Sequence, residues 1–416
     1  MSNPLLDSLA AGFGGTDAAR RGALDAALRA GLPGPRDEAW KYTPLRALER
    51  RSFAAVADGE PAAAIEPALL AAIPAPRLVF VNGRLDDALT DLAGLPGAIT
   101  LSSGGDPAHA SATPAPASQV FRQLNAALAR DGMLLRVDGD AGKTPLQLVS
   151  IGAPAAADLA WHLRHRIDVS AGAVLVLVEH HLDAGAHRHL DTARLALQVG
   201  AGARVVHARV QARDAGATTL LHTDASLADH ADYRRIDLEL GAALSRHELE
   251  VHLAGAGAAI AANGVLLAGG RRHLDTRLGI RHGARDTAST LRWRGIGAGR
   301  GRAVFHGGIT IDAGADGSNA DLSNRNLLLS ADAEVDAPPV LVIHADEVKA
   351  AHGATVGQLD PSALFYLRSR GIPADAARRL LTAAFVRETL SVLDDDALRA
   401  PLQAALEGAL AALDPA

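Results

Sequence analysis

Two kinds of hydrophobic pattern divide the chain, with helical periodicity near both ends and strand-like alternation between them. From about residue 133 to 345, short segments alternate apolar and polar positions and follow one another closely. They include MLLRVDG, PLQLVSI, WHLRHRIDV, AVLVLVE, ARVVHARVQ, YRRIDLEL and AVFHGGITI. Many short strands at close spacing predict an all-β architecture for this region.

The turns between these segments favour one kind of β architecture. They are built from small residues, as in SAGA (170–173), GAGA (200–203) and AGAGA (254–258), and they are not regular Asn-Gly hairpin turns. Small turns between strands of similar length are typical of a parallel β-solenoid, in which each coil stacks on the one before. The repeat length is irregular, so a β-sandwich or a cupin-like double sheet is the competing architecture.

The region before the strands, residues 1–132, is predicted to be mostly helical. One helix runs from Thr16 as its N-cap to Gly31 as its C-cap. A short strand and turn follow at 77–85, where Asn82-Gly83 gives a tight-turn signal. The Gly/Ser/Ala/Pro-rich segment 102–118 lacks large apolar residues and predicts a mobile loop.

The region after the strands, residues 346–416, is also predicted to be mainly helical. Two helices are broken at 371–373, and a third begins with the proline of 401–413. This third helix carries the apolar stripe Leu402, Leu406, Leu410 and Leu413. The sequence thus predicts an N-terminal region (1–132), a β core (133–345) and a C-terminal helical region (346–416).

Composition narrows the classes of function. Hydrophobic residues make up 48% of the chain and aromatic residues only 3%, so the core is built from aliphatic side chains. There are 41 basic against 47 acidic residues, and this balance argues against nucleic acid as a partner. The absence of cysteine excludes a thiolate nucleophile and a Cys-ligated zinc or iron–sulfur site held by this chain alone. With no apolar run of membrane-spanning length and no signal-like N-terminus, we expect a cytoplasmic protein without a membrane partner.

The densest histidine cluster is EHHLDAGAHRHLD, with His180, His181, His187 and His189. The His-x-His pair on one strand face has suitable geometry for a metal. A cupin-type site would need a glutamate a few residues further on, where the chain has Ala193 and Arg194. The alternative interpretation is an exposed polar strand face. This cluster nevertheless supports one candidate function, a β-solenoid or cupin-like metalloenzyme.

A second feature lies in the C-terminal helices. Leu380, Leu381, Ala384, Phe385 and Val392 are predicted to form an apolar face from which Glu388 projects. A carboxylate within an apolar stripe is costly unless it is paired. Either an intradomain salt bridge, to Arg378, Arg379 or Arg387, satisfies it, or the helix docks onto a second protein.

Five segments in order along the chain resemble the SufB/SufD family of iron–sulfur cluster assembly proteins. They are EAWKYTPL (38–45), LVFVNGRL (78–85), FRQLNAALARDG (121–132), SNRNLLLSADAEVDAPPVLVIHADEVKAAHGATVGQLD (323–360) and ALFYLRSRGI (363–372). The joint run of HGATVGQLD and FYLRSRGI is the most specific part of the resemblance, and EAWKYTPL together with the modest length favours the SufD branch.

The resemblance implies a fold and a set of partners. The fold would be a right-handed parallel β-helix between helical N- and C-terminal regions. The chain would be a non-catalytic scaffold that pairs with SufB through the β-helix and binds the ABC-type ATPase SufC through its C-terminal helices, with Leu381, Phe385 and Glu388 as candidate contacts. The resemblance also links such a complex to iron supply and to a reduced flavin, whose binding residues the sequence does not indicate.

One residue in the matching segment carries a candidate chemical role. Family members often have Val-Lys-Cys-Ser-His-Gly-Ala-Thr where this chain has VKAAHGAT, so that Ala350 stands at the cysteine position and His352 keeps its register. The resemblance implies that His352 is a shared iron or cluster ligand at the interface with SufB. A single imidazole binds metal weakly, so a shared site is the sensible use for it, and no cofactor is expected to be held tightly by the lone chain. An isolated chain with an unpaired β edge could also form a homodimer.

Overall fold

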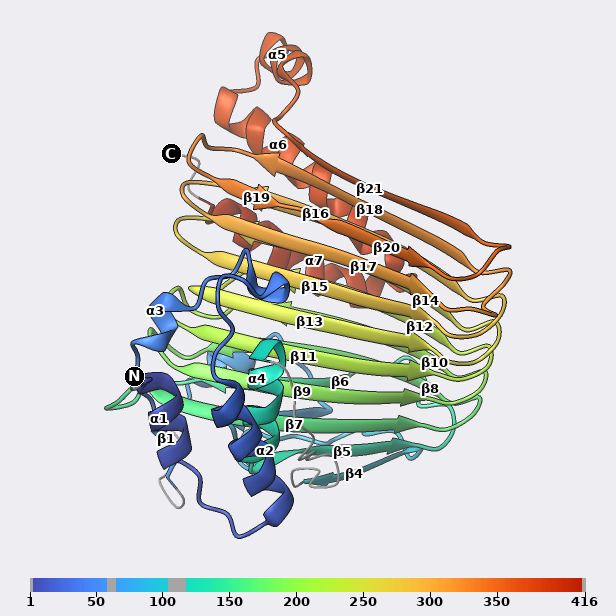
Figure 1. Ribbon diagram of the computed structural model, residues 1–416. Helices are drawn as coiled ribbons and strands as arrows, with labels where there is room; N and C mark the ends of the chain where they lie inside the picture. The colour runs from blue at the N-terminus through green and yellow to red at the C-terminus, as the bar shows by residue number, and fades with distance from the viewer. Residues whose placement is uncertain (1–2, 58–64, 104–116, 414–416) are drawn as a thin grey trace.

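The computed structural model describes residues 3–57, 65–103 and 117–413 and has a parallel β-solenoid at its centre. Successive strands alternate between two sheets, so that each coil adds one strand to each sheet (Figure 1). The parallel solenoid predicted from the small-residue turns is confirmed. The sandwich and cupin alternatives are wrong because neighbouring strands in each sheet are parallel except at its first strand.

The first sheet is built mainly from odd-numbered strands. In spatial order from the first coil it is formed by β4 (Ile99–Ser103), β5 (Asp131–Val137), β7 (Leu159–Val169), β9 (Leu190–Val199), β11 (Thr218–Leu227), β13 (Leu244–Leu253), β15 (His273–His282), β17 (Arg302–Ile311) and β19 (Glu334–Asp336). Off this path, β1 (Ala54–Ala55) pairs with β7, and β20 (Pro339–Ile343) pairs with β17.

The second sheet lies on the other side of the solenoid interior. Its order is β3 (Arg84–Leu85), β2 (Arg77–Val81), β6 (Leu146–Gly152), β8 (Val174–Asp183), β10 (Arg204–Gln211), β12 (Asp232–Glu239), β14 (Ala259–Ala268), β16 (Ala288–Gly297), β18 (Asn319–Leu328) and β21 (Lys349–Gly357). From β9 to β17, each residue pairs with a residue of the next coil that lies 26 to 29 positions later in the chain. The coils extend beyond the predicted core range 133–345, because β2 pairs with β6 and β21 pairs with β18.

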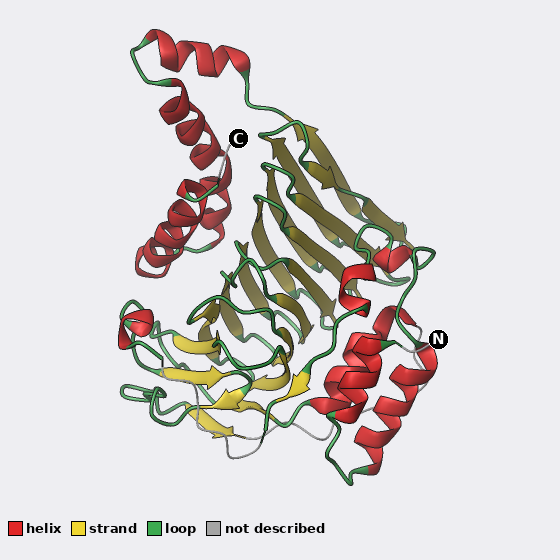
Figure 2. Cartoon of the chain, turned by 90° about the vertical axis from the view of Figure 1, so that its left-hand side faces the viewer, coloured by secondary structure: helices red, strands yellow, loops and turns green. Residues whose placement is uncertain are grey.

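Helices cover the outer face of each sheet. In the N-terminal region, α1 (Pro4–Ala11), α2 (Ala18–Ala30), α3 (Arg46–Glu49) and α4 (Val120–Leu128) pack with the outer face of the first sheet, and short 3₁₀ turns lie at Glu38–Trp40, Pro67–Leu70 and Ala117–Gln119. The C-terminal α6 (Ala374–Arg387), the 3₁₀ turn η5 (Glu388–Val392) and α7 (Asp396–Ala411) cover the second sheet, while α5 (Pro361–Ser369) stands away from the body (Figure 2).

The N-terminal region is fastened to the solenoid by polar as well as apolar contacts. The Thr43 hydroxyl donates to Asp275 Oδ2 at 2.6 Å, and the guanidinium carbon of Arg246 lies 3.8 Å from the centroid of the Trp40 ring. Both contacts reach across more than two hundred residues of sequence. They show why Trp40 and Thr43, in EAWKYTPL, matter for docking this region on the first sheet.

Local sequence signals account for several element boundaries. Asn82 and Gly83 adopt positive φ and connect the antiparallel β2 and β3, which confirms the predicted tight turn. Gly31 ends α2 with a φ of 69°, as predicted, but Asp17 rather than Thr16 caps its start, since the Asp17 carboxylate accepts from Arg20 N.

The start of the last helix differs from the prediction. Helix α7 begins at Asp396, five residues before Pro401, because the Asp395 side chain caps the helix by accepting the backbone N–H of Ala397. The predicted break between the two preceding helices is confirmed: α5 ends at Ser369 and α6 begins after Pro373. The predicted mobile loop at 102–118 falls mainly on 104–116, which lies outside the described residues.

The part of the chain described by the structure has no helix long and apolar enough to cross a membrane.

Candidate functional site

The last coil of the solenoid is open and carries His352. This residue lies on β21 opposite Leu322 of β18, and Leu322 belongs to the interior core, so the imidazole is on the interior side of the strand. In the coils below, such positions are covered by the next coil. Here no described strand follows β21 in the sheet, and His352 is exposed.

Two exposed apolar side chains face the interior at the same open end as His352. Ile343 of β20 pairs with the buried Ile311. Val356 of β21 lies four residues after His352 and therefore on the same face of the strand. Both are interior-facing, yet Ile343 is 43% exposed and Val356 is 47% exposed. A strand edge with exposed apolar residues is a template for pairing with another chain. The open end, defined by β20 and β21, is therefore a candidate interaction surface, and it carries the imidazole of His352.

The C-terminal helices contact the second sheet through the side chains predicted to reach a partner. Phe385 is half-buried against an outer cluster that includes Val265 and Ile296, and the guanidinium carbon of Arg294 lies 5.7 Å from its ring centroid. Leu381 is also half-buried. These two residues therefore have much of their surface covered within the chain itself.

Glu388 finds its partner on the solenoid. Arg294 Nη2 of β16 lies 3.1 Å from Glu388 Oε2, and the Arg294 side chain is 2% exposed while that of Glu388 is 58% exposed. The proposed intradomain pair with Arg378, Arg379 or Arg387 is wrong, because the ion pair runs instead to a distant strand. Arg387 pairs with Glu407 of α7.

The most exposed apolar residues of this region lie on α5 and the outer side of α6. Phe365 is 73% exposed, Tyr366 is 57% exposed and Leu380 is 54% exposed. Helix α5 has no buried residue, and it projects beyond the last coil in Figure 1. Large apolar side chains on a projecting helix make this surface, defined by Phe365, Tyr366 and Leu380, a second candidate docking site.

The histidine cluster at 180–189 makes contacts with the protein rather than forming an exposed polar face. His181, His187 and His189 are buried, and His180 Nε2 lies 2.8 Å from Gln147 Oε1. Both ring nitrogens of His189 have backbone partners, at Leu159 N and Ala153 O. His187 Nε2 lies 3.0 Å from Asp183 Oδ1. Across the described residues, no group of three or more His, Cys, Asp or Glu side chains is arranged to hold a metal ion.

A buried ionic network fills the solenoid interior at β8, β10 and β12. In the register of these strands Glu179, Arg209 and Asp237 stack as a column of alternating charge. Arg209 Nε donates to Asp237 Oδ1 at 2.8 Å, and Arg209 also pairs with Glu239. Arg235 donates to both oxygens of Asp237, each at 2.8 Å. Burial would raise the pKa of Asp237, but the charges of Arg235 and Arg209 hold it well below its usual range.

The network crosses from one sheet to the other through His247. His247 of β13 contacts Arg209 Nη2 through Nδ1 at 3.0 Å and Thr223 Oγ1 through Nε2 at 3.2 Å. Burial, followed by the charge of Arg209, lowers the pKa of His247 well below its usual range. The imidazole is therefore a neutral bridge between the sheets.

The sequence carries a signal for this network in the alternation of two of its strands. Polar residues recur at every second position of VVHARVQAR and YRRIDLEL, and the usual expectation is that they point to water. In the structure it is the intervening apolar positions, such as Val206, Ala208 and Ile236, that point outward, because the C-terminal helices cover them.

Buried neutral histidines predict a loss of stability in mild acid. Burial lowers the pKa of His165 and of His282 to about 4, below the value near 6.5 of an unfolded chain. Between these values the unfolded chain binds more protons, so the free energy of unfolding falls as the pH drops from 6.5 towards 4. Going from pH 7.5 to 5 should cost up to about 2 kcal/mol for each such histidine.

The measurement is urea unfolding at pH 7.5 and pH 5. His282→Gln removes one titrating group while its neighbours Thr287 and Ser289 still offer hydroxyls to an amide. We expect the variant to lose less stability than the parent chain over this interval, whatever its stability at pH 7.5. His230→Gln, at an exposed turn position, serves as the control and should retain the parent's pH dependence. Equal losses in all three proteins would contradict the prediction.

Comparison with known proteins identifies the family. Residues 152–385 match the family model described as SUF system FeS cluster assembly, SufBD core domain. The chain belongs to the SufB/SufD family. It is 33% identical over 382 residues to the iron–sulfur cluster assembly protein SufD of Escherichia coli, with 90% of this chain and 89% of that protein covered. An iron–sulfur cluster assembly SufBD family protein of Synechocystis is 31% identical over 392 residues, covering 89% and 86% of the two chains. Protein ABCI7 of Arabidopsis thaliana is 27% identical over 207 residues, covering 49% of this chain and 43% of that protein.

The matched residues include both candidate surfaces. The interval 152–385 contains most of the coils, the open end with His352, and helix α5 with Phe365 and Tyr366. The family resemblance seen in the sequence is thereby confirmed.

Proposed function

We propose that this chain is a scaffold subunit in iron–sulfur cluster assembly, and that it works through its two docking surfaces rather than through a catalytic centre of its own. Relatives that cover most of the chain carry this role in their names. The observation that carries the proposal is the open end of the solenoid, where interior-facing apolar residues and His352 are exposed together.

The partner at the open end is a paralogous β-helix of the SufB type. Its last coil would cover Ile343 and Val356 and would bring cysteine thiolates to His352. Thiolate and neutral imidazole are both ligands that iron accepts, and a cysteine-free chain can supply only the second kind. Iron or a nascent cluster is here the cargo of the complex, passed through a site that neither chain completes alone.

The partner at the C-terminal helices is an ATPase of the SufC type. The exposed surface of Phe365, Tyr366 and Leu380 supports this assignment better than Leu381 and Phe385, which are half-buried against the solenoid. Glu388 remains a candidate contact, since more than half of its side chain is exposed. Its ion pair with Arg294 would transmit a movement of the helices to β16.

Exchange of His352 for alanine tests the ligand role. We expect His352→Ala to fold normally and to form the complex with SufB-type and SufC-type partners, because the imidazole is exposed. The yield of reconstituted cluster, followed by its visible absorption, should fall at least severalfold. His344→Ala removes another exposed imidazole at the end of β20 and should leave the yield unchanged. Full cluster yield from His352→Ala would remove the ligand role.

Substitution on α5 tests the ATPase surface. Phe365→Ser is expected to weaken binding of the SufC-type ATPase by at least tenfold, since large aromatic residues dominate such contacts. The solenoid should remain intact because Phe365 is mostly exposed. Pull-down and calorimetric titration measure the effect, and Leu134→Ser, at an exposed leucine of β5 in the opposite part of the stack, is the control. Unchanged affinity in Phe365→Ser would place the ATPase elsewhere.

A further inference from the structure

The strand that carries His352 is held only weakly by its own side chains. β21 has the sequence KAAHGATVG, and all of its residues except Ala350 are exposed. Alanine and glycine give a strand little packing against its neighbours. β21 pairs with β18 on one side, and no described strand pairs with its other side. A strand in this position opens locally unless further contacts hold it.

Two asparagines of β18 supply such contacts from inside the solenoid. Asn324 and Asn326 lie two and four residues after the interior-facing Leu322, so they share its face of the strand. Their exposed fractions are 1% and 3%. Asn326 Nδ2 donates to Asn324 Oδ1 at 2.6 Å and to the backbone oxygen of Thr355, in β21, at 3.0 Å. Both N–H bonds of this amide are therefore in use.

The chain of amides continues to the coil below. Asn324 Nδ2 lies 3.5 Å from the backbone oxygen of Trp293, in β16. Side-chain hydrogen bonds thus join β16, β18 and β21, which are neighbours in the second sheet. Such bonds are stronger in a buried interior than in water. They add to the backbone ladder at the end of the solenoid where side-chain packing contributes least.

The amide of Asn326 occupies a position where an apolar side chain would pack better. Gly295 of β16 pairs with Asn326, and a Cβ atom at Gly295 would lie 2.2 Å from Asn326 Oδ1. The same oxygen is buried without a hydrogen-bond partner. An unsatisfied buried acceptor destabilises the fold, and leucine would avoid it. What asparagine offers in return is the N–H that reaches β21.

The hydrogen bond from Asn326 leaves the free edge of β21 open. Lys349 N donates to Ser318 O, so every second residue from Lys349 onward directs its backbone groups towards β18, and Thr355 is one of them. His352 belongs to the alternate set, whose backbone groups face the free edge. Fastening Thr355 therefore holds the strand without covering its edge or the imidazole.

We propose that Asn324 and Asn326 are positioning residues, which hold β21 on β18 so that His352 and the free strand edge are in place before a partner binds. This role rests on the function proposed above for the open end. A strand that is already ordered avoids the loss of conformational entropy that binding would otherwise impose. Both asparagines act through β21, because both are buried beneath it.

Hydrogen exchange of the lone full-length chain, followed by mass spectrometry, tests this role. Asn326→Leu removes the donor, and Asn326→Ala removes it without any risk of overpacking. In both variants we expect the amides of β21 to exchange about fivefold faster, which corresponds to the loss of one hydrogen bond, while those of β17 keep their rates. Asn319→Leu makes the same change at an exposed position of β18 and should leave the exchange of β21 unchanged. Parent-like exchange of β21 in both Asn326 variants would refute the proposal.

A signal from the imidazole itself separates positioning from a general effect on stability. His352→Ala identifies the ¹H–¹³C signal of His352 in the spectrum of the lone chain. Relaxation dispersion of this signal should increase in the Asn326 variants and stay at the parent level in Asn319→Leu, because only the former release the strand. Unchanged dispersion in the Asn326 variants would show that the asparagines do not position His352. Neither measurement uses iron or a partner, so failure of the ligand role of His352 would leave both results valid.

Discussion

Replacing Arg209 with methionine is expected to lower the free energy of unfolding by about 3–5 kcal/mol. Arg209 is 1% exposed and stands between Glu179 and Asp237 in the charge column of the solenoid interior. Methionine keeps most of the volume but removes the charge, so Glu239 loses one of its partners and Asp237 keeps only Arg235. Buried carboxylates that lack a paired positive charge destabilise the folded state, and this lowers the free energy of unfolding.

Urea unfolding, followed by far-ultraviolet circular dichroism, measures this effect. The matched control is Arg281→Met, which removes the same kind of ion pair, to Asp312, from a side chain that is 61% exposed. Water solvates the remaining carboxylate there, so the loss should stay within about 1 kcal/mol. Equal losses in the two variants would mean that the interior network does not hold the coils together.

The second large effect is expected at the open end. Introducing Ile343→Asp and Val356→Asp together should abolish pairing with a SufB-type partner, because two carboxylates would have to be buried without counter-charges at the interface. The chain itself should fold normally, since both side chains already contact water. Size-exclusion chromatography of the mixed subunits gives the result directly.

The neighbouring residue Val340 provides the control for this variant. It lies on the same strand as Ile343 and has a similar exposure of 41%. Val340 pairs with Gly308, next to the interior-facing Ile309, so its side chain points to the outer side. Val340→Asp should leave pairing intact. A complex that survives the double substitution, or fails equally with Val340→Asp, would contradict pairing through the interior side of the last coil.

The solenoid could be predicted from the sequence, whereas the direction of its side chains could not. Small-residue turns and short alternating strands are local features, and they were sufficient for the architecture. Which alternating set faces inward depends on what covers the outside. At Val206 and Ala208 the cover comes from helices almost two hundred residues later in the chain, so the same pattern is compatible with both orientations.

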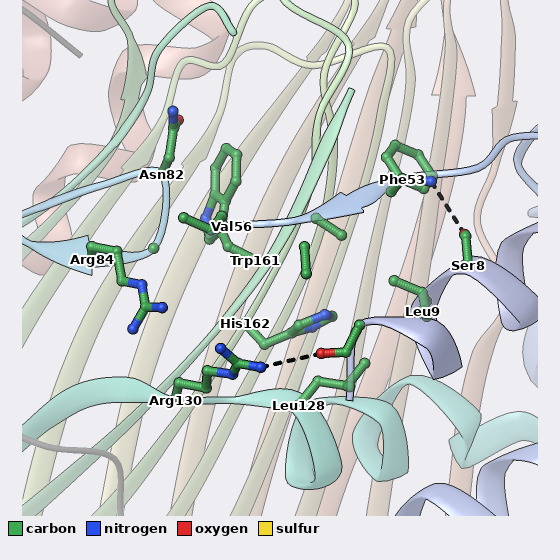
Figure 3. Close-up of a pocket in the computed structure, with 14 residues that line it drawn as sticks. Ser8, Leu9, Phe53, Val56, Asn82, Arg84, Leu128, Arg130, Trp161 and His162 are labelled. Carbon is green, nitrogen blue, oxygen red and sulfur yellow. Dashed lines mark hydrogen bonds between the residues drawn. The ribbon is translucent and has the colours of Figure 1, made fainter. Parts of the chain in front are cut away.

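The candidate site shows the same division between local and distant information. The position of His352 on a strand near the end of the core follows from its segment, and the structure adds that this strand is the last of its sheet. The partner of Glu388 could not be read from neighbouring arginines, because Arg294 is brought beside it only by packing η5 on the second sheet. A small pocket beside Trp161 likewise depends on distant segments, because it lies where neither β1 nor β5 pairs with β7 (Figure 3).

The two ends of the solenoid differ in the direction of their outermost strands. At the first coil each sheet ends in an antiparallel strand, β4 beside β5 and β3 beside β2, whereas the last coil ends in parallel strands. Head-to-tail addition would require a parallel rung at both ends, and the first coil does not offer one. Association through the open end, as proposed above, would therefore leave no matching parallel edge for another copy of the chain, and a filament of stacked coils would not grow.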